Sequence, residues 1–143
     1  MRTLVLLTIA ILGQGFAYAD TLQTESEMRA FADRVMAKVG SGDLAGAFAL
    51  MKPYTIVPAA EFDAMTLASK AQRDQVGARF GPAVGYEYIR KSTAGESLLK
   101  FTYIEKTERH ALPWMFYFYH SPKGWVLNSF IWNDRMVDLF VGS

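Results

Sequence analysis

The sequence predicts an α+β domain in which three helices pack against one face of a curved, four-stranded antiparallel meander. Three observations lead to this prediction. Apolar residues recur at helical spacing as far as Phe80, the period changes to 2 after Gly85, and turn signals then divide the remaining chain into four strands. The expected organisation is a signal peptide, residues 1–19, followed by a single domain, residues 20–143.

The first residues have the pattern of a secretory signal peptide. Arg2 precedes an apolar run, and the tripeptide AYA stands just before Asp20. A charged start, an apolar middle and a small-residue exit are typical of a cleaved leader. The alternative is a retained membrane anchor, but the apolar run before Gln14 is shorter than the roughly 20 residues that span a bilayer. We expect cleavage after Ala19 and a bacterial periplasmic or secreted protein.

The expected mature chain is electrically neutral and contains no cysteine. The full sequence has 15 basic and 14 acidic residues, and removal of the leader takes away Arg2 and no acidic residue. Neutrality argues against nucleic-acid binding and against electrostatic capture by an anionic membrane. The lack of cysteine excludes disulfides and a lipid anchor on cysteine. Small apolar molecules and protein partners remain as ligand classes.

Apolar periodicity predicts three helices, at residues 25–39, 41–53 and 58–80. Thr24 is expected to cap the first helix, and either Ser41 or Asp43 the second. The third helix has proline in its first turn and ends at a Gly-Pro pair. Its expected inward stripe consists of Phe62, Met65, Ala68, Gln72, Val76 and Phe80.

Three turns, at residues 94–95, 107–109 and 121–124, separate the expected strands. The register predicted across these turns pairs Thr93 with Glu96, Lys106 with Ala111, and His120 with Trp125. One face of the sheet is then apolar in all four strands and is expected to pack against the helices. A bulge near Pro113 or Pro122 would exchange the faces. After the last strand, a helical turn is expected to fold Met136, Val137 and Phe140 back onto the domain.

Two N-terminal helices, a short extended piece, a long third helix and a four-stranded meander resemble the cystatin-like roll shared by nuclear transport factor 2, ketosteroid isomerase and SnoaL-like proteins. The segments GDLAGAFALMKP, GARFGPAVGYEYIRKS and YHSPKGWVLNSFIWND are similar to those of secreted, uncharacterised members of this superfamily. The resemblance covers essentially the whole expected mature chain. It is informative about fold and nearly silent about activity.

The resemblance implies a cone-shaped cavity between the third helix and the sheet. The expected pocket residues are Tyr86, Tyr88, Tyr103, Trp114, Phe116 and Ser129. Their phenol, indole and hydroxyl groups on an apolar wall are typical of a small-molecule site. The alternative is that these large side chains fill the cavity and form only core. Arg90 is a further candidate: it either anchors an anionic group at the pocket mouth or pairs with Glu61 or Asp63.

The opposite face of the last two strands is expected to be aromatic. Its predicted members are Met115, Tyr117, Tyr119, Phe130 and Trp132. Left in water, they would form a larger apolar patch than soluble monomers usually expose. We therefore expect a homodimer interface here, or a surface covered by the C-terminal segment.

No residue pattern predicts a catalytic centre. The inner rows contain tyrosines but no base, because Glu105 and His120 are expected at opposite rims of the sheet. Metal-ligand spacings, phosphate-binding loops and nucleophile motifs are all missing from the sequence, so no metal or other cofactor is expected. The favoured hypothesis is a noncatalytic exported binding or interaction module. The alternative is a small isomerase- or hydratase-like enzyme that uses a pocket tyrosine as acid, and a purely dimerising or adaptor domain is a third possibility.

Overall fold

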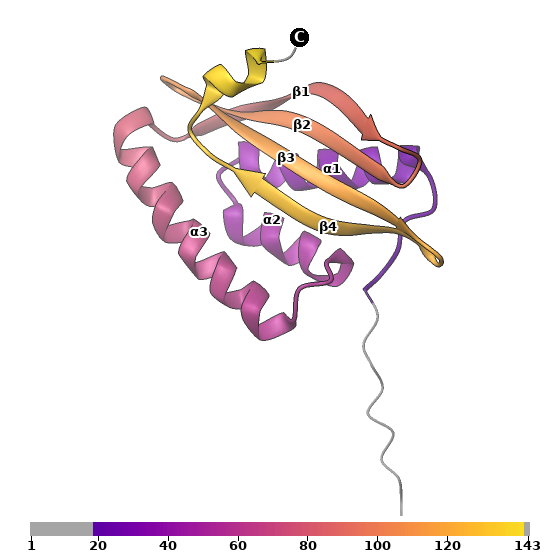
Figure 1. Cartoon of the computed structure of the whole chain (residues 1–143). Helices are drawn as coiled ribbons and strands as arrows, with labels where there is room; N and C mark the ends of the chain where they lie inside the picture. Colours follow the sequence, from indigo (N-terminus) through magenta and orange to yellow (C-terminus); the bar gives the residue numbers. More distant parts are fainter. Residues whose placement is uncertain (1–18, 142–143) are drawn as a thin grey trace, which may run out of the picture.

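The computed structural model of the protein describes residues 19–141 and has an α+β arrangement, with three helices ahead of a four-stranded antiparallel sheet (Figure 1). The helices are α1 (Glu25–Gly40), α2 (Leu44–Met51) and α3 (Ala59–Phe80), with a 3-10 turn, η1 (Lys52–Tyr54), after α2. The strands are β1 (Ala83–Ala94), β2 (Leu98–Thr107), β3 (Ala111–Ser121) and β4 (Gly124–Trp132), followed by a 3-10 turn, η2 (Met136–Phe140). Neighbouring strands pair in the order β1-β2-β3-β4, so the predicted α+β class and meander are confirmed. The expected signal peptide lies outside the described residues except for Ala19.

The first two helices begin at side-chain caps. Thr24 Oγ1 accepts a hydrogen bond from the Glu27 backbone N–H at 3.1 Å, and the Glu27 carboxylate accepts one from the Gln23 N–H at 2.7 Å. Asp43 caps α2, because its Oδ1 accepts from the Gly46 N–H at 2.9 Å. The bonds to Thr24 and Asp43 satisfy main-chain donors that the first turn of a helix leaves without partners.

The core lies between the first two helices and one face of the sheet, which we call the inner face. The inner face carries the side chains of Leu99, Phe101, Tyr103, Trp114, Phe116, Phe118 and Leu127. Figure 1 shows α1 and α2 lying across this face. From α1, Met28, Phe31, Val35 and Met36 are buried against it. Burying each such side chain contributes about 1.5–3 kcal/mol, so this layer supplies most of the driving force for folding.

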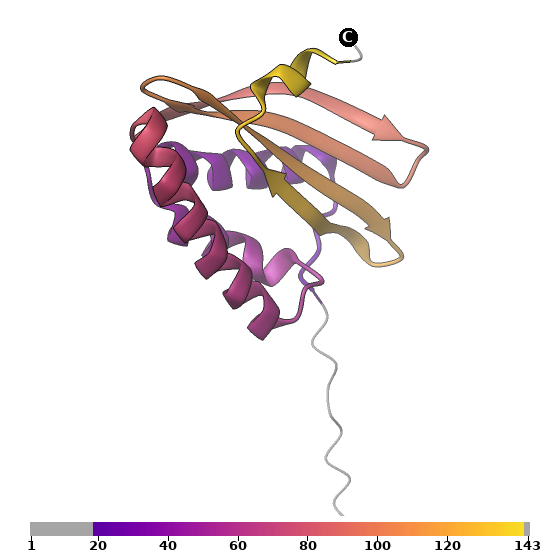
Figure 2. The same ribbon diagram turned by 60° about the vertical axis from the view of Figure 1, so that its left-hand side comes forward.

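The third helix is much less buried than the other two. Phe62 is its one fully buried residue, and Figure 2 shows α3 inclined to the sheet, with its N-terminal half beside α2. The predicted inward stripe is wrong at Ala68 and Gln72, which are exposed. Ser69 and Arg73 face inward instead, because each makes a polar contact with an inner-face side chain of the sheet.

The predicted register is confirmed at two of the three turns. Lys106 lies opposite Ala111, and His120 lies opposite Trp125. Between β1 and β2 the prediction is wrong, since Thr93 pairs with Leu99. The turn here has three residues rather than two, and its first residue, Gly95, takes a left-handed conformation with φ of 61°, which glycine adopts without steric cost.

A β-bulge at Asn128 reverses the expected faces of the second half of β4. Phe118 pairs with Leu127, but Tyr117 pairs with Ser129, which leaves Asn128 without a partner residue. The side chains beyond the bulge therefore change face. The outward positions predicted for Phe130 and Trp132 are wrong, because both side chains pack in the core. Ser129 and Ile131 point away from it, contrary to prediction.

Ring contacts hold the residues beyond this bulge in the core. The Trp132 ring stacks on Trp114 with centroids 5.9 Å apart, and the Phe130 ring lies 5.3 Å from that of Phe48 on α2. In the predicted register these two rings would lie on the opposite face of the sheet, away from this core. Burial of the two rings therefore offsets the loss of regular strand pairing at the bulge.

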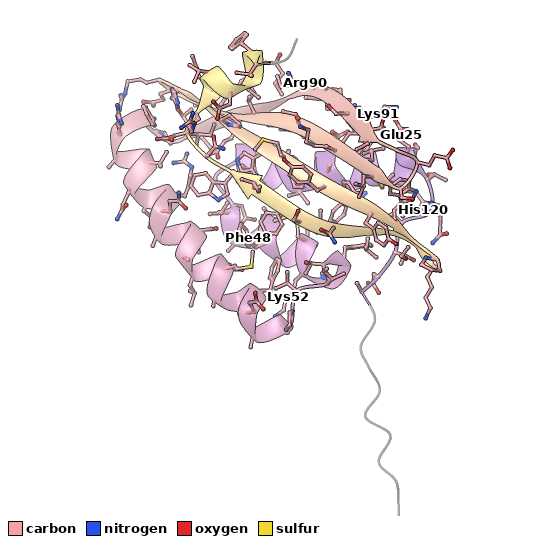
Figure 3. The ribbon with its side chains drawn as sticks, in the orientation of Figure 1. Glu25, Phe48, Lys52, Arg90, Lys91 and His120 are labelled. Carbon is pink, nitrogen blue, oxygen red and sulfur yellow. The ribbon has the colours of Figure 1, made fainter. Side chains whose placement is uncertain are left out.

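A second bulge, between Tyr88 and Arg90, turns Arg90 to the outer face of the sheet. The expected inner position of Arg90 is therefore wrong. Its Nη1 donates to the Leu139 carbonyl at 2.9 Å, and Figure 3 shows the residue beside η2. Of the two carboxylates considered as its partners, Asp63 instead binds Lys52 at 2.7 Å.

The predicted C-terminal helical turn is present as η2, but its apolar side chains are exposed. Met136, Val137 and Phe140 were expected to fold back onto the domain, and Phe140 is 75% exposed. Main-chain atoms attach this segment to the sheet: the Asp134 carbonyl lies 2.8 Å from His110 Nε2, and the Leu139 carbonyl binds Arg90. With the segment attached through carbonyl groups, the side chains of Met136, Val137 and Phe140 face outward.

The bulge at Asn128 can be tested with two neighbouring residues that it places on opposite faces. Trp132→Ala should lower the free energy of unfolding by about 3–5 kcal/mol, because it removes a buried ring. Ile131→Ala should cost less than about 1 kcal/mol, because this side chain is 48% exposed. Urea unfolding measures both. Equal costs, or a larger cost for Ile131→Ala, would contradict this register.

Candidate functional site

A cleft lies between α3, the start of β1 and the loop that joins α1 to α2, and we call it the α3 cleft. Its volume is about 380 Å3. Its lining includes the apolar residues Val39, Leu44, Pro82 and Ala83 and the charged residues Arg73, Asp74 and Glu105. A mostly apolar wall with a few polar groups is the usual composition of a small-molecule site.

A buried ion pair between Arg73 and Glu105 forms part of the cleft wall. The side chains are 13% and 2% exposed. Arg73 Nε donates a hydrogen bond to Glu105 Oε1 at 2.8 Å, and Arg73 Nη2 lies 2.8 Å from the same oxygen. Trp114 Nε1 donates to Glu105 Oε2 at 3.3 Å. Both carboxylate oxygens are therefore satisfied within the protein, which a buried charge requires.

Strand alternation and the helical period bring these two residues together. Glu105, which was expected at a rim of the sheet, follows Phe101 and Tyr103 on the inner face of β2, so it is buried and points into the fold. Arg73 lies one turn after Ser69 on the inward side of α3. The sequence reasoning missed Arg73 altogether. The inward position of Glu105 could have been predicted from the sequence, because Glu105 lies an even number of residues from the buried aromatic residues Phe101 and Tyr103.

Among the residues that line the α3 cleft there is no recognisable catalytic group. The Glu105 carboxylate is fully engaged with Arg73 and Trp114. Among residues 19–141, no group of three or more histidine, cysteine, aspartate or glutamate residues is placed to hold a metal ion. The two histidine rings stack on aromatic rings, His110 on Phe80 at 4.1 Å and His120 on Trp125 at 4.7 Å.

Five of the seven predicted pocket residues come together on the inner face. Tyr88, Tyr103 and Trp114 share one cross-strand row, and Tyr86 and Phe116 flank it. The ring centroids of Tyr88 and Tyr103 are 5.3 Å apart, and those of Tyr103 and Phe116 are 5.7 Å apart. Three of the five side chains are fully buried, so these rings largely fill the space that the prediction left for a ligand. None of the five lines the α3 cleft.

The other two predicted pocket residues, Ser129 and Arg90, lie on the outer face. Because of the two bulges, their side chains lie on the opposite side of the sheet from the other five residues. They therefore belong to a different surface from the α3 cleft.

Tyr103 is held by an acidic side chain from α1. Its hydroxyl donates to Asp33 Oδ1 at 2.6 Å, and Arg29 Nε donates to the same oxygen at 3.0 Å. The Arg29 guanidinium also lies over the Tyr88 ring, 3.3 Å from its centroid. Burial, and then the bond to Asp33, raise the pKa of Tyr103 well above its ordinary value of 10.0. The hydroxyl is a fixed hydrogen-bond donor and a poor proton donor at neutral pH.

In comparisons with protein-family models, with curated proteins and with solved structures, the chain has no match. Within residues 19–141, no helix is both long and apolar enough to cross a membrane.

Removing one partner of the buried ion pair should be costly. Arg73→Met should lower the free energy of unfolding by about 3–5 kcal/mol, because Glu105 then remains buried without a cation. The double variant Arg73→Met/Glu105→Leu should recover most of this loss, since an apolar pair of similar size has no charge to compensate. Lys70→Met, at an exposed position one turn earlier on α3, is the control. Chemical denaturation that finds Arg73→Met as mild as this control would contradict the geometry.

Replacing Tyr103 should change how stability depends on pH. Above about pH 10, the unfolded chain releases the Tyr103 proton while the folded chain retains it, so wild-type stability falls as pH rises. Tyr103→Phe should cost about 1–2 kcal/mol at pH 8 through the lost hydrogen bond, and its stability should fall less steeply between pH 10 and 11. Tyr119→Phe, on the outer face, should keep the wild-type decline. Parallel slopes for wild type and Tyr103→Phe would refute the raised pKa.

Proposed function

We propose that this protein is a noncatalytic exported module that binds a small, neutral, largely apolar molecule in the α3 cleft. The observation that carries the proposal is the buried Arg73–Glu105 pair in the wall of a cleft that is otherwise mainly apolar. Such a pair contributes little net stability compared with apolar packing of the same volume. A role in ligand recognition accounts for charged residues at this position.

The size and charge of the cleft support this class of ligand. Its volume of about 380 Å3 falls within the usual range of small-molecule sites. Arg73 and Glu105 cancel each other's charge, and the nearby Lys70 and Asp74 on α3 are also opposite in sign. The free-energy cost of desolvation on binding here is therefore smaller for a neutral molecule than for an ion.

The cystatin-like roll is the fold we propose for this module. The α+β arrangement, with a cleft between the third helix and the sheet, supports this choice. Export is proposed from the leader pattern at residues 1–19.

Enzymatic activity based on a pocket tyrosine has less support than binding. Asp33 is a carboxylate beside the Tyr103 hydroxyl, so a base does lie within hydrogen-bond distance of a predicted acid. However, a general acid needs a pKa near the working pH, and the pKa of Tyr103 is shifted upward, away from it. Asp33 and Tyr103 are better explained as a structural link between α1 and β2.

The homodimer through the outer face of the sheet stays a prediction. Of its five expected residues, Met115, Tyr117 and Tyr119 do belong to the outer face, whereas the bulge moves the other two into the core. The apolar area available for such an interface is correspondingly smaller. The ligand proposal does not depend on this dimer.

Native mass spectrometry of the protein purified from an exporting host tests the ligand proposal. We expect an extra mass that disappears on denaturation. Ala83→Phe should abolish it, because the added ring fills the cleft, whereas Val84→Phe should retain it, because the neighbouring Val84 side chain is 60% exposed. Circular dichroism checks that both variants fold. A wild-type protein without added mass, or a ligand retained by Ala83→Phe, would overturn the proposal.

A further inference from the structure

A groove of about 420 Å3 crosses the outer face of the sheet, on the side opposite the inner aromatic cluster. One complete cross-strand row runs through it, formed by Ser92, Lys100, Tyr117 and Ser129. We call this the outer groove. Because the row has one member on each strand, the groove depends on the register of the whole sheet and on the bulges in β1 and β4.

Lys100 is the charged group of the outer groove. Its side chain is half-buried, and its ammonium lies 5.9 Å from the centroid of the Tyr117 ring. No carboxylate lies within ion-pair distance of it among the described residues. Two other lysines of β1 and β2 are paired: Lys91 with Glu25 at 2.9 Å, together in Figure 3, and Lys106 with Glu87 at 3.3 Å.

The rows on either side of Lys100 do not supply the missing negative charge. One row consists of Arg90, Thr102, Met115 and Ile131, and the other of Ala94, Leu98, Tyr119 and Val126. Neither contains an acidic residue, and the first adds a second cation. Since charges within about 8–10 Å act on one another at physiological salt, this part of the outer face favours an anion.

Hydroxyl groups also lie on this part of the sheet and can donate hydrogen bonds. The Ser92 hydroxyl belongs to the residue directly opposite Lys100. Thr102 is 2% exposed, and its Oγ1 makes no hydrogen bond to any described residue. Thr102 belongs to the neighbouring row, whereas Leu98 and the Tyr117 ring provide apolar surface within the groove itself. The groove therefore combines a cation, hydroxyl donors and an apolar wall.

We infer that the outer groove binds an amphipathic monoanion, with its carboxylate at Lys100 and Ser92 and its hydrocarbon part along Leu98 and Tyr117. A carboxylate supplies the negative charge that the row lacks, and a charge-assisted bond to a half-buried ammonium is stronger than a neutral one. This site is independent of the proposed function. It lies on the opposite face from the α3 cleft and takes an ion rather than a neutral molecule.

Binding of decanoate, followed by NMR of backbone amides, tests this inference directly. Decanoate should shift the amides of Ser92, Lys100 and Tyr117, while decanol and decyltrimethylammonium should bind at least tenfold more weakly. Lys100→Met should weaken decanoate binding by about tenfold or more, which corresponds to the loss of one charge-assisted hydrogen bond. Lys100→Arg should keep the affinity within about threefold. Lys106→Met, farther along β2, should leave it unchanged.

Other results would overturn the inference. Decanol that binds as tightly as decanoate would mean an apolar groove with no anion selectivity. Unchanged affinity in Lys100→Met, or no binding at all, would exclude the site. A dimer in light scattering whose interface buries the groove amides would make a second copy of the chain the occupant. Ala83→Phe separates the two proposals, because it should remove the ligand of the α3 cleft and leave decanoate binding intact.

Discussion

The pairing of β2 with β3 is the constraint on which the rest of the structure depends. This ladder runs from Leu98–Tyr119 to Lys106–Ala111 without a bulge, whereas both outer strands are irregular. Because side chains alternate between faces, an uninterrupted ladder keeps the buried rings of the two central strands on the inner face, namely Phe101, Tyr103, Trp114, Phe116 and Phe118. The helices α1 and α2 pack on that surface. The outer strands then adjust by bulges, so that their own apolar side chains reach a core whose position is already fixed.

The features that the sequence predicts well are those in which local signals agree with one another. At the β2–β3 and β3–β4 turns, turn residues and apolar alternation specify the same pairing, and both predicted pairs are confirmed. Beyond Asn128 the local signal is ambiguous, because apolar side chains stand on both faces of the strand. One register turns Ile131 toward the core, and the other turns Phe130 and Trp132 toward it. Contacts with Phe48 and Trp114 decide between them. These contacts join residues far apart in the sequence, so no local pattern contains them.

The candidate site departs from the sequence pattern for a related reason. The inward stripe predicted for α3 includes Ala68 and Gln72. This prediction corresponds to a helix turned by about one residue from its true orientation. The inward side actually carries Ser69 and Arg73, whose partners are Trp132 and Glu105 on the sheet. Paired polar groups inside a fold violate the simple rule of apolar residues inward, and such violations concentrate at functional sites. The inward position of Glu105 could be predicted from strand alternation. The inward position of its partner, Arg73, depends on the packing angle of α3 and could not.

The weak burial of α3 and the ion pair beneath it are two aspects of one arrangement. Phe62 anchors one end of the helix in the core, and Arg73 reaches Glu105 farther along. Long polar side chains hold a helix and a sheet apart where apolar packing would close the space, and this separation leaves the α3 cleft open. The same strand then carries Glu105 toward the inner side and Lys100 toward the outer side. Alternation along β2 thus places opposite charges on two separate surfaces, so the two proposed sites can differ in ligand charge without interfering with each other.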